Sequence, residues 1–354
     1  MVSDKTETNF DTIISDAFAA TKNRNVKILS PDALDEAMIK GKIARSEDDK
    51  VAAFINAYSK KIIMIDAKGE KARINVLIAN SSNLPLQFIV KAGKGAEIEL
   101  FEYYASVSGQ EALVAPLHEI IADEGSKVEV TILHNESKNA YVAGYTKCSA
   151  KEKASVKLNF IYSGAAAVRA KNIVDADGIG SSVEVNELAV GAEDQKFDIS
   201  TNITNAKQYT SARIETGAVL DDRSHCMVKG FAKVAKLAKG AKSRINERGI
   251  ILSKDAHIDA LPDMSIDYSD QVSATHSAAT APINKEALFY LTSRGLEEKT
   301  ARKLFVTSFI TKYLNGISNS AIRELAISTM LDKVDTKEYG RVNEITLRNI
   351  WSTS

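Results

Sequence analysis

Cysteine is scarce in this sequence. Only two, Cys148 and Cys226, occur in 354 residues, and they stand far apart with no C-x-x-C pair. A disulfide framework needs an ordered set of cysteines and a structural zinc site needs paired thiolates, so both are excluded. Any thiol chemistry would depend on one sulfur at a time. We interpret Cys226, which follows His225, as a small buried apolar residue, with a reactive thiolate as the alternative.

Long apolar runs and an excess of either charge are also absent. No stretch approaches the roughly 18 apolar residues of a membrane-spanning helix, and the N-terminal "MVSDKTETNFDTIISDAF" has acidic residues where a signal peptide has basic ones. Lys and Arg total 46, as do Asp and Glu, so no basic field exists to hold nucleic acid or an anionic membrane. The composition therefore predicts a soluble cytoplasmic protein that recognises its partners locally.

The common catalytic motifs are missing as well. The five histidines are scattered with none at the i, i+4 spacing of a zinc-binding helix, and there is no G-x-S-x-G, no Walker A and no G-x-G-x-x-G after a strand. Carboxylates that could serve a solenoid polysaccharide hydrolase stand at Asp221, Asp222, Asp255, Asp259, Asp263, Asp267 and Asp270. The simpler interpretation is that these aspartates are turn residues.

The middle of the chain alternates apolar and polar residues, which is typical of half-buried strands. The clearest runs are "AEIELFEYYAS", "SKVEVTILHN", "ASVKLNFIYS" and "SSVEVNELAV". Their first alternating apolar residues, Ile98, Val128, Val156 and Val183, are separated by 30, 28 and 27 residues. This internal repeat indicates one structural unit that recurs along the chain.

A second, shorter spacing points to the kind of repeat. Ile245, Ile258 and Val272 are separated by 13 and 14 residues, about half of the earlier distance. Two short strands in each coil would produce both spacings, so the pattern favours a mainly β protein with a β-helix core, in which each coil contacts only its neighbours. A β-sandwich is the alternative.

Helical patterns are expected at both ends, giving an N-terminal helical region over residues 1–64, a β-helix core over 65–282 and a C-terminal helical domain over 283–354. The N-terminal helix is predicted within residues 8–60, from the spacing of Phe10, Ile13, Ile14, Ala17 and Phe18, with a further run over 32–43 beginning after Ser30 and Pro31. Asn284 is a good N-cap for residues 285–295, and an amphipathic helix follows up to Gly316. We expect these helices to cover the ends of the solenoid, and a bare end to form a dimer surface.

The stretch "RINERGIILSKDAHIDALPDMSIDYSDQVSATHSAATAPINKEALFYLTSRGL" carries three ordered motifs. The first, L-x-S-x-x-A-x-[IV]-D-x-x-P-x-[LM], is matched by Leu252, Ser253, Ala256, Ile258, Asp259, Pro262 and Met264. The second, H-[GE]-A-[ST], begins at His276, and the third, FYL-x-[SQ]-RG, is matched by Phe289, Tyr290, Leu291, Ser293, Arg294 and Gly295. Over roughly residues 200–315 the chain resembles the SufB/SufD family, the scaffold proteins of SUF iron–sulfur cluster assembly.

This resemblance implies a right-handed parallel β-helix that pairs with a second subunit through the end of its solenoid. His276 would then lie in the subunit interface as a ligand to iron or to a transient iron–sulfur cluster, none of it tightly bound by this chain alone. SufB-type members of the family carry a cysteine in the preceding turn, where this chain has Ala256, so the resemblance is to SufD-like members. The family's glycine after the histidine is Ser277 here. A satisfied histidine at a coil corner is the alternative for His276.

The resemblance also implies a non-catalytic scaffold with two partners, a SufB-like subunit and a SufC-like ABC-type ATPase. The ATPase would dock on the helices after Arg294, where an apolar stripe includes Phe305, Phe309 and Tyr313. The alternatives are a homodimeric scaffold of the same family, which the isolated chain could also form, and a β-solenoid polysaccharide hydrolase.

Overall fold

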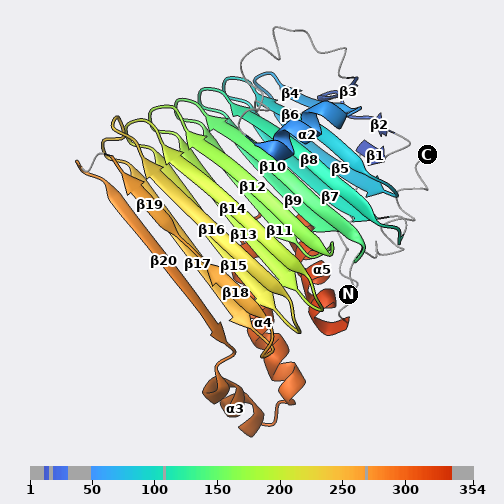
Figure 1. Ribbon diagram of the computed structural model, residues 1–354. Coiled ribbons are helices and arrows are strands. Elements are labelled where there is room, and N and C mark those ends of the chain that lie inside the picture. Colours follow the sequence, from blue (N-terminus) through green and yellow to red (C-terminus); the bar gives the residue numbers. More distant parts are fainter. Residues whose placement is uncertain (1–11, 16–18, 31–48, 107–108, 268–269, 337–354) are drawn as a thin grey trace, which may run out of the picture.

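The chain folds as a parallel β-helix built from two long sheets that face each other (Figure 1). The computed structural model describes residues 12–15, 19–30, 49–106, 109–267 and 270–336. Successive strands alternate between the two sheets, so each coil contributes one strand to each, as the short sequence spacing indicates. The predicted β-helix core is therefore confirmed.

Each sheet contains ten strands within the described residues. Sheet A runs, in spatial order, through β2 (Ala19–Thr21), β1 (Thr12–Ser15), β5 (Lys71–Asn80), β7 (Glu97–Ser106), β9 (Lys127–Asn135), β11 (Ser155–Tyr162), β13 (Ser182–Gly191), β15 (Ser211–Leu220), β17 (Lys242–Ile251) and β20 (Ser273–Pro282). Sheet B runs through β18 (His257–Ala260), β16 (His225–Val234), β14 (Lys196–Asn205), β12 (Ala167–Ala176), β10 (Ala140–Ala150), β8 (Ala112–Ala122), β6 (Leu84–Ala92), β4 (Ile62–Ala67) and β3 (Val26–Leu29), with β19 (Asp263–Ile266) beside β18 on β16.

The register follows the repeat found in the sequence. Ile98 pairs with Val128, Val128 with Val156, and Val156 with Val183, so the four predicted strands stack in sheet A. Ile258 lies in the opposite sheet, half a coil from Ile245. Val272 differs, because it lies just before β20 and packs at a corner with Ala238 and Ala241.

The corners of the coils repeat one backbone conformation. Two positions before each sheet A strand from β5 to β20 stands a residue with a left-handed φ of 53° to 75°: Gly69, Gly95, Gly125, Lys153, Gly180, Tyr209, Gly240 and Gln271. Glycine adopts this conformation without a steric penalty, which explains its frequency there. The same local turn therefore starts each coil.

The core lies between the sheets and consists mainly of aliphatic rows that run along the solenoid. Helices cover the outer faces. α2 (Lys50–Tyr58) packs on sheet B through Ala52 and Ile55, whereas α4 (Glu298–Leu314) and α5 (Ser320–Thr336) pack on sheet A in a second apolar cluster. Sheet A is thus buried on both faces over much of its area.

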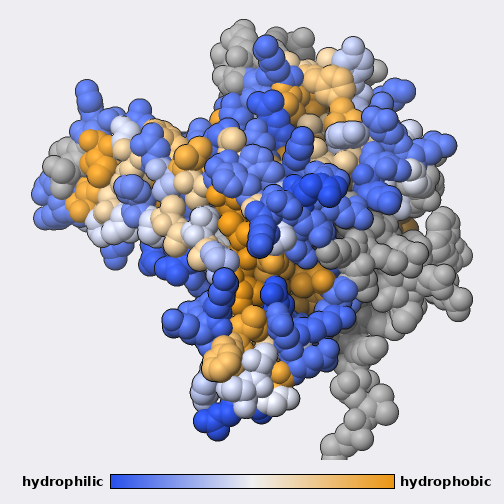
Figure 2. All heavy atoms as spheres, turned by 60° about the horizontal axis from the view of Figure 1, so that its bottom comes forward, coloured by the Kyte–Doolittle hydropathy of each residue, from blue (hydrophilic) through white to orange (hydrophobic). Residues whose placement is uncertain are grey.

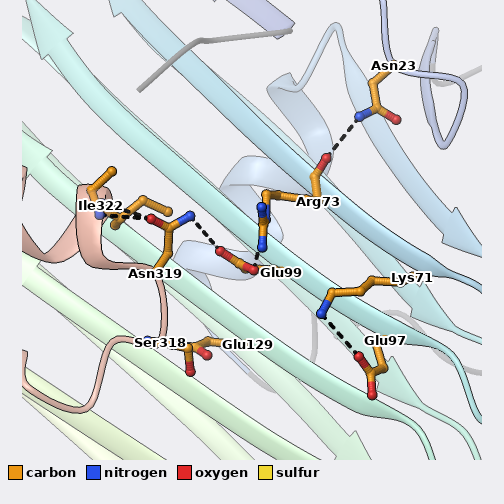
Figure 3. Close-up of polar contacts among 10 residues, drawn as sticks. Asn23, Lys71, Arg73, Glu97, Glu99, Glu129, Ser318, Asn319 and Ile322 are labelled. Atoms are coloured by element: carbon orange, nitrogen blue, oxygen red, sulfur yellow. Dashed lines mark hydrogen bonds and ion pairs between the residues drawn. The ribbon is translucent and has the colours of Figure 1, made fainter. Parts of the chain in front are cut away.

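The turn between α4 and α5 is fixed to sheet A by polar contacts (Figure 3). Asn319 caps α5 by accepting from the backbone N–H of Ile322, and its side-chain amide donates to Glu99 on β7 at 2.8 Å. The backbone N–H of Ser318 donates to Glu129 on β9 at 2.9 Å. The helical layer is therefore held in one place on the sheet.

The predicted N-terminal helix is wrong where the structure describes it. Residues 12–15, 19–21 and 26–29 form β1, β2 and β3, and α2 is the one helix among the described residues of this N-terminal region. Ile13 and Ile14 align with Leu77 and Ile78 of β5, so pairing with the sheet edge outweighs the helical spacing of the apolar residues. Phe10, Ala17, Phe18 and the predicted helix over 32–43 lie outside the described residues.

The expectation that helices cover the ends of the solenoid is also wrong for the described helices. α2, α4 and α5 lie on the outer faces of the sheets, and the N-terminal end is completed by β2 and β3, which pair antiparallel with β1 and β4. None of the helices in the described ranges is long and apolar enough to cross a membrane. At the opposite end of the solenoid, none of the helices that the structure describes covers the last strands.

Candidate functional site at the open end of the solenoid

The last coil leaves the edges of both sheets bare. β20 is the final strand of sheet A and β18 and β19 are the final strands of sheet B, and no further strand pairs with them in the described part of the chain. Apart from the half-buried Ala274, all side chains of β20 are exposed. Pro262, which has no N–H to donate, lies in the break between β18 and β19. This bare coil is called the open end below.

His276 lies on the inner side of the open end. It is in register with Ile245 and completes a row of core residues that runs along sheet A: Ile74, Leu100, Val130, Leu158, Val185, Ile214 and Ile245. These seven residues are buried, whereas His276 is exposed. An imidazole thus replaces an aliphatic side chain at the one rung of this row that no later coil covers.

The surroundings of His276 leave room for a ligand. Its neighbours on the same face of β20 are Ala274 and Ala278, because side chains alternate along a strand. Ser277 points to the other face and donates to Asn246 at 2.9 Å. No hydrogen bond or ion pair within the described residues occupies the imidazole. The alternative interpretation, a corner histidine satisfied by its neighbours, is not supported for His276 by any contact in the described residues.

A buried carboxyl lies one rung below the open end. Glu247 is in register with Ala278 and accepts from the backbone N–H of Gly230 at 2.8 Å, while its second oxygen has no partner in the described residues. A Cβ at Gly230 would meet this carboxyl at 2.6 Å, so the glycine makes room for it. Burial raises the pKa of Glu247 to about 7. The carboxyl can therefore gain or lose a proton near neutral pH.

Glu247 belongs to a row of buried polar groups inside the solenoid. Glu187 lies two rungs deeper in the same row and accepts from Thr216 at 2.7 Å and from Asn172 at 3.1 Å. Burial also raises the pKa of Glu187. Glu102 occupies the same register row but is separated from Glu187 by the apolar Phe160 and Ile132, and it contacts the imidazole of His118 at 2.9 Å. Sequence reasoning missed the polar segment from Glu187 to Glu247, which ends one rung below the open end.

The chain offers no exposed thiol at this site. Cys148 and Cys226 are both buried, and burial raises the pKa of each thiol, so both remain protonated. Cys226 stands on the inner face of β16 within the main core, which confirms its interpretation as a small buried residue. Ala256 is buried just before β18 and supplies no ligand atom.

Three of the aspartates considered for a hydrolase have structural roles. Asp267 and Asp270 pair with Lys233 and Lys239 at 3.7 and 3.2 Å. Asp222 has a left-handed φ of 53° and lies in a corner turn, as the simpler interpretation expects.

The three predicted docking residues have different positions. Tyr313 is buried, with its ring against Gly217 of β15, so it belongs to the packing of α4 on sheet A and cannot contact a partner. Phe309 is half-buried in the same cluster, and Phe305 is half-buried as well. The stripe is apolar, as its spacing indicates, but Phe309 and Tyr313 pack in the cluster between the helices and sheet A.

The exposed apolar residues of this region lie on α3 (Lys285–Ser293) and the start of α4. Phe289 is 73% exposed, Tyr290 57% and Leu304 49%, and α3 buries none of its residues. α3 extends beyond the end of β20, away from the sheets (Figure 1). Figure 2 views this end of the molecule and shows hydrophobic residues gathered between hydrophilic areas. Phe289 and Tyr290 were found in the sequence as parts of a motif, not as surface residues.

The fold and the site define a two-sheet parallel β-helix protein whose last coil is bare and carries an unoccupied imidazole in the row of core residues. A family model described as "SUF system FeS cluster assembly, SufBD core domain" matches residues 76–309. The chain belongs to this family, and the resemblance found in the sequence is confirmed.

Three curated relatives illustrate the range of similarity. The iron–sulfur cluster assembly protein SufD of Escherichia coli is 20% identical over 235 residues, which are 66% of this chain and 55% of that protein. A SufBD family protein of Pyrococcus horikoshii is 26% identical over 66% of this chain and 52% of its own length. One from Methanothermobacter thermautotrophicus is 26% identical over 73% and 59%. The matched part of this chain thus spans little more than half of each relative.

Proposed function

We propose that this chain is a non-catalytic, SufD-like scaffold subunit of iron–sulfur cluster assembly. Its open end pairs with a SufB-like subunit, and His276 supplies a ligand to iron or to a nascent cluster held between the two chains. The cargo is transient and is shared with the partner. The observation that carries this proposal is the unoccupied imidazole of His276 at the bare rung of an otherwise aliphatic row.

The bare edges of both sheets support pairing through the open end. Exposed edge strands present unsatisfied N–H and C=O groups and tend to pair with other chains. A second solenoid would satisfy the edges of β20 and β18 and cover Leu261 and Ile266, which are 53% and 47% exposed. An imidazole at this joint would then be removed from water and would need a partner, which a metal ion provides.

The nature of the missing ligands supports a partner of a different type. Iron–sulfur species prefer thiolates with some imidazole, and both cysteines of this chain are buried and protonated. Ala256 supplies no sulfur at the position where SufB-type members of the family carry a cysteine. A homodimer would bring two imidazoles and no thiolate to the joint. The pairing that completes the ligand set is therefore with a cysteine-bearing, SufB-like chain.

The second partner is a SufC-like ABC-type ATPase that docks on α3 and the start of α4. Phe289, Tyr290 and Leu304 form an exposed apolar surface there, and Phe305 adds a half-buried aromatic ring. An apolar patch of this kind is costly to leave in water and marks contact with another protein. Closure of an ATPase attached at this end would move β20, which α3 directly follows, and so open the joint as a rigid-body switch.

The iron-ligand role is tested with His276 variants of the complex purified under anaerobic conditions. Because the side chain is exposed in the isolated chain, His276→Ala should leave its folding unchanged while the complex retains several-fold less iron. His276→Cys should recover part of the iron, because a thiolate is also an iron ligand, whereas His276→Gln should not. Folding is checked by circular dichroism, and pairing by co-elution with the SufB-like subunit.

Two results would contradict the proposal. Equal iron content in the cysteine and glutamine variants would show that position 276 is not a ligand. Stable sedimentation of the isolated chain as a dimer, together with failure to co-elute with a SufB-like subunit, would instead support the homodimeric scaffold.

A further inference from the structure

A second group of ligand-type side chains lies on the outer face of sheet B, where the last coil meets the coil before it. His225 on β16 and His257 on β18 are register partners, so they stand side by side on neighbouring strands. Asp259 follows His257 by two residues and points to the same face, because side chains alternate along a strand. The parallel register thus brings the imidazole of His225 next to the carboxylate of Asp259, which follows it by 34 residues in the sequence, and next to the imidazole of His257.

The three side chains already contact one another. One oxygen of Asp259 lies 2.9 Å from Nε2 of His225, and the other lies 2.9 Å from Nε2 of His257. One ligand atom from each residue can be chosen so that all three lie within 4.8 Å of one another. The two rings are 5.4 Å apart between centroids. The carboxylate therefore lies between two imidazoles whose nitrogens face a common space.

This arrangement fits a metal ion after a small adjustment. Zinc–nitrogen and zinc–oxygen bonds of about 2.0 to 2.2 Å place tetrahedral ligand atoms about 3.3 Å apart. The side chains of His225, His257 and Asp259 are 39%, 67% and 35% exposed, so rotation about their side-chain bonds can bring the donors this close without disturbing the core. Water can fill the remaining coordination positions.

The donor set selects the class of metal. Two imidazoles and a carboxylate suit Fe²⁺, Zn²⁺, Co²⁺ and Ni²⁺, whereas Mg²⁺ and Ca²⁺ prefer oxygen ligands alone and Cu⁺ prefers sulfur. The neighbouring register positions add one charge of each sign, Lys196 beside His225 and Asp198 beside Met227. The local charge therefore neither repels nor concentrates cations, and selectivity rests on the ligands.

We propose that His225, His257 and Asp259 form a binding site for a divalent first-row transition metal ion on the outer face of sheet B, between the last coil and the coil before it. The bound ion ties the edge strand β18 to β16. It therefore stabilises the coil that also carries His276, although the two sites lie on opposite sheets. This proposal does not depend on the proposed function, because it concerns metal binding by the isolated chain.

The site is tested with Co²⁺, whose visible absorption reports the number and type of its ligands, in the full chain without a histidine tag. All variants carry His276→Ala, which removes the other exposed imidazole from the signal. We expect one equivalent of Co²⁺ to produce ligand-field bands, Zn²⁺ to displace it, and the midpoint of thermal unfolding to rise with Zn²⁺ but not with Mg²⁺. Asp259→Asn and His257→Ala should each weaken Co²⁺ binding at least tenfold and abolish the thermal shift.

The matched control is Asp198→Asn, which removes a carboxylate from the same face of sheet B but none of the three ligands. It should change the affinity less than threefold. Unchanged Co²⁺ affinity in the folded Asp259→Asn and His257→Ala variants would overturn the proposal and leave a hydrogen-bonded His–Asp–His cluster. Equal loss of the Co²⁺ ligand-field bands in the Asp198→Asn control and in the ligand variants would also overturn it. Co²⁺ would then be attracted by the charge of the surface and not bound by the three ligands.

Discussion

Replacement of Glu247 by glutamine should change how the stability of the protein depends on pH. Burial raises the pKa of this carboxyl from an ordinary value of 4.5 to about 7 in the folded chain, so the folded state holds the proton more tightly than the unfolded state. The stabilising effect of Glu247 is therefore complete below pH 4.5 and is lost as the pH rises to about 7. The glutamine variant stays neutral over this range.

The size of the effect follows from the two pKa values. Each pKa unit corresponds to about 1.4 kcal/mol, so the difference between 4.5 and about 7 corresponds to about 3 kcal/mol. Glutamine can still accept from the N–H of Gly230, but its amide replaces an oxygen that has no partner in the described residues, which adds a cost that does not vary with pH. The ionisation of Glu247 is therefore tested by how the difference in unfolding free energy between the two proteins changes with pH, and not by the size of that difference at one pH.

The assay is urea unfolding of the wild type and the Glu247→Gln variant at constant ionic strength from pH 4.5 to 8. The wild type should lose about 3 kcal/mol relative to the variant between the two ends. Glu187 is present in both proteins, so the two pH profiles differ by the ionisation of Glu247 together with its repulsion of Glu187. An exposed control, Glu298→Gln on α4, should run parallel to the wild type. Parallel curves for wild type and Glu247→Gln would show that the carboxyl ionises equally in both states and would refute the reasoning.

Two further predictions concern the helices. Burial holds the pKa of Lys333 well below its ordinary value, so the unfolded state binds the proton more tightly and wild-type stability should rise with pH toward 10. Lys333→Met should flatten this slope in pH-dependent urea unfolding, and an unchanged slope would contradict the lowered pKa. The stability at a single pH is not the test, because the substitution also removes the hydrogen bonds of Lys333 to the carbonyl of Ser163 and to the side chain of Gln195. Phe289→Ser and Tyr290→Ser should each weaken co-elution with the SufC-like ATPase at least tenfold without loss of folding, whereas Tyr58→Ser, an exposed aromatic residue on α2, should not; equal retention by all three would place docking elsewhere.

The register of the solenoid could be predicted from the sequence because one face of each sheet A strand is aliphatic at its start. Ile98, Val128, Val156 and Val183 occupy the same inner position in successive coils, and each pairs with the next. Every coil must place this residue against the opposite sheet, so the spacing of the apolar residues gives the length of the coil directly.

The same alternation fails in the second half of these strands, where α4 and α5 cover the outer face. In β13, the inner position is taken by Glu187, while Leu188 and Val190 point outward into the cluster with the helices. A sequence with apolar residues outside and a carboxylate inside is indistinguishable from an ordinary half-buried strand. The buried polar row was therefore invisible until the register placed Glu187 against Thr201 and Asn172.

The N-terminal strands could not be predicted because their pairing is not local. β1 is four residues long and joins sheet A by parallel pairing with β5, which begins more than fifty residues later. A segment this short has too few positions to distinguish a period of two from a period of 3.6. His276 was identified through its motif, but its position at the end of an aliphatic row needed the register.

The exchange of an aliphatic residue for histidine at the open end links pairing to cargo under the proposed function. An isoleucine at position 276 would continue the row and make the joint apolar whether or not anything is bound. An imidazole that is buried by the partner without a ligand leaves a polar group unsatisfied, which costs about 1 to 3 kcal/mol. A bound metal ion removes that cost, so cargo strengthens pairing and pairing strengthens the hold on cargo by the same factor. An interface that only had to be stable would retain the aliphatic row. With histidine at position 276, the interface is weaker when it is empty, so the two subunits separate more easily once the metal ion has left.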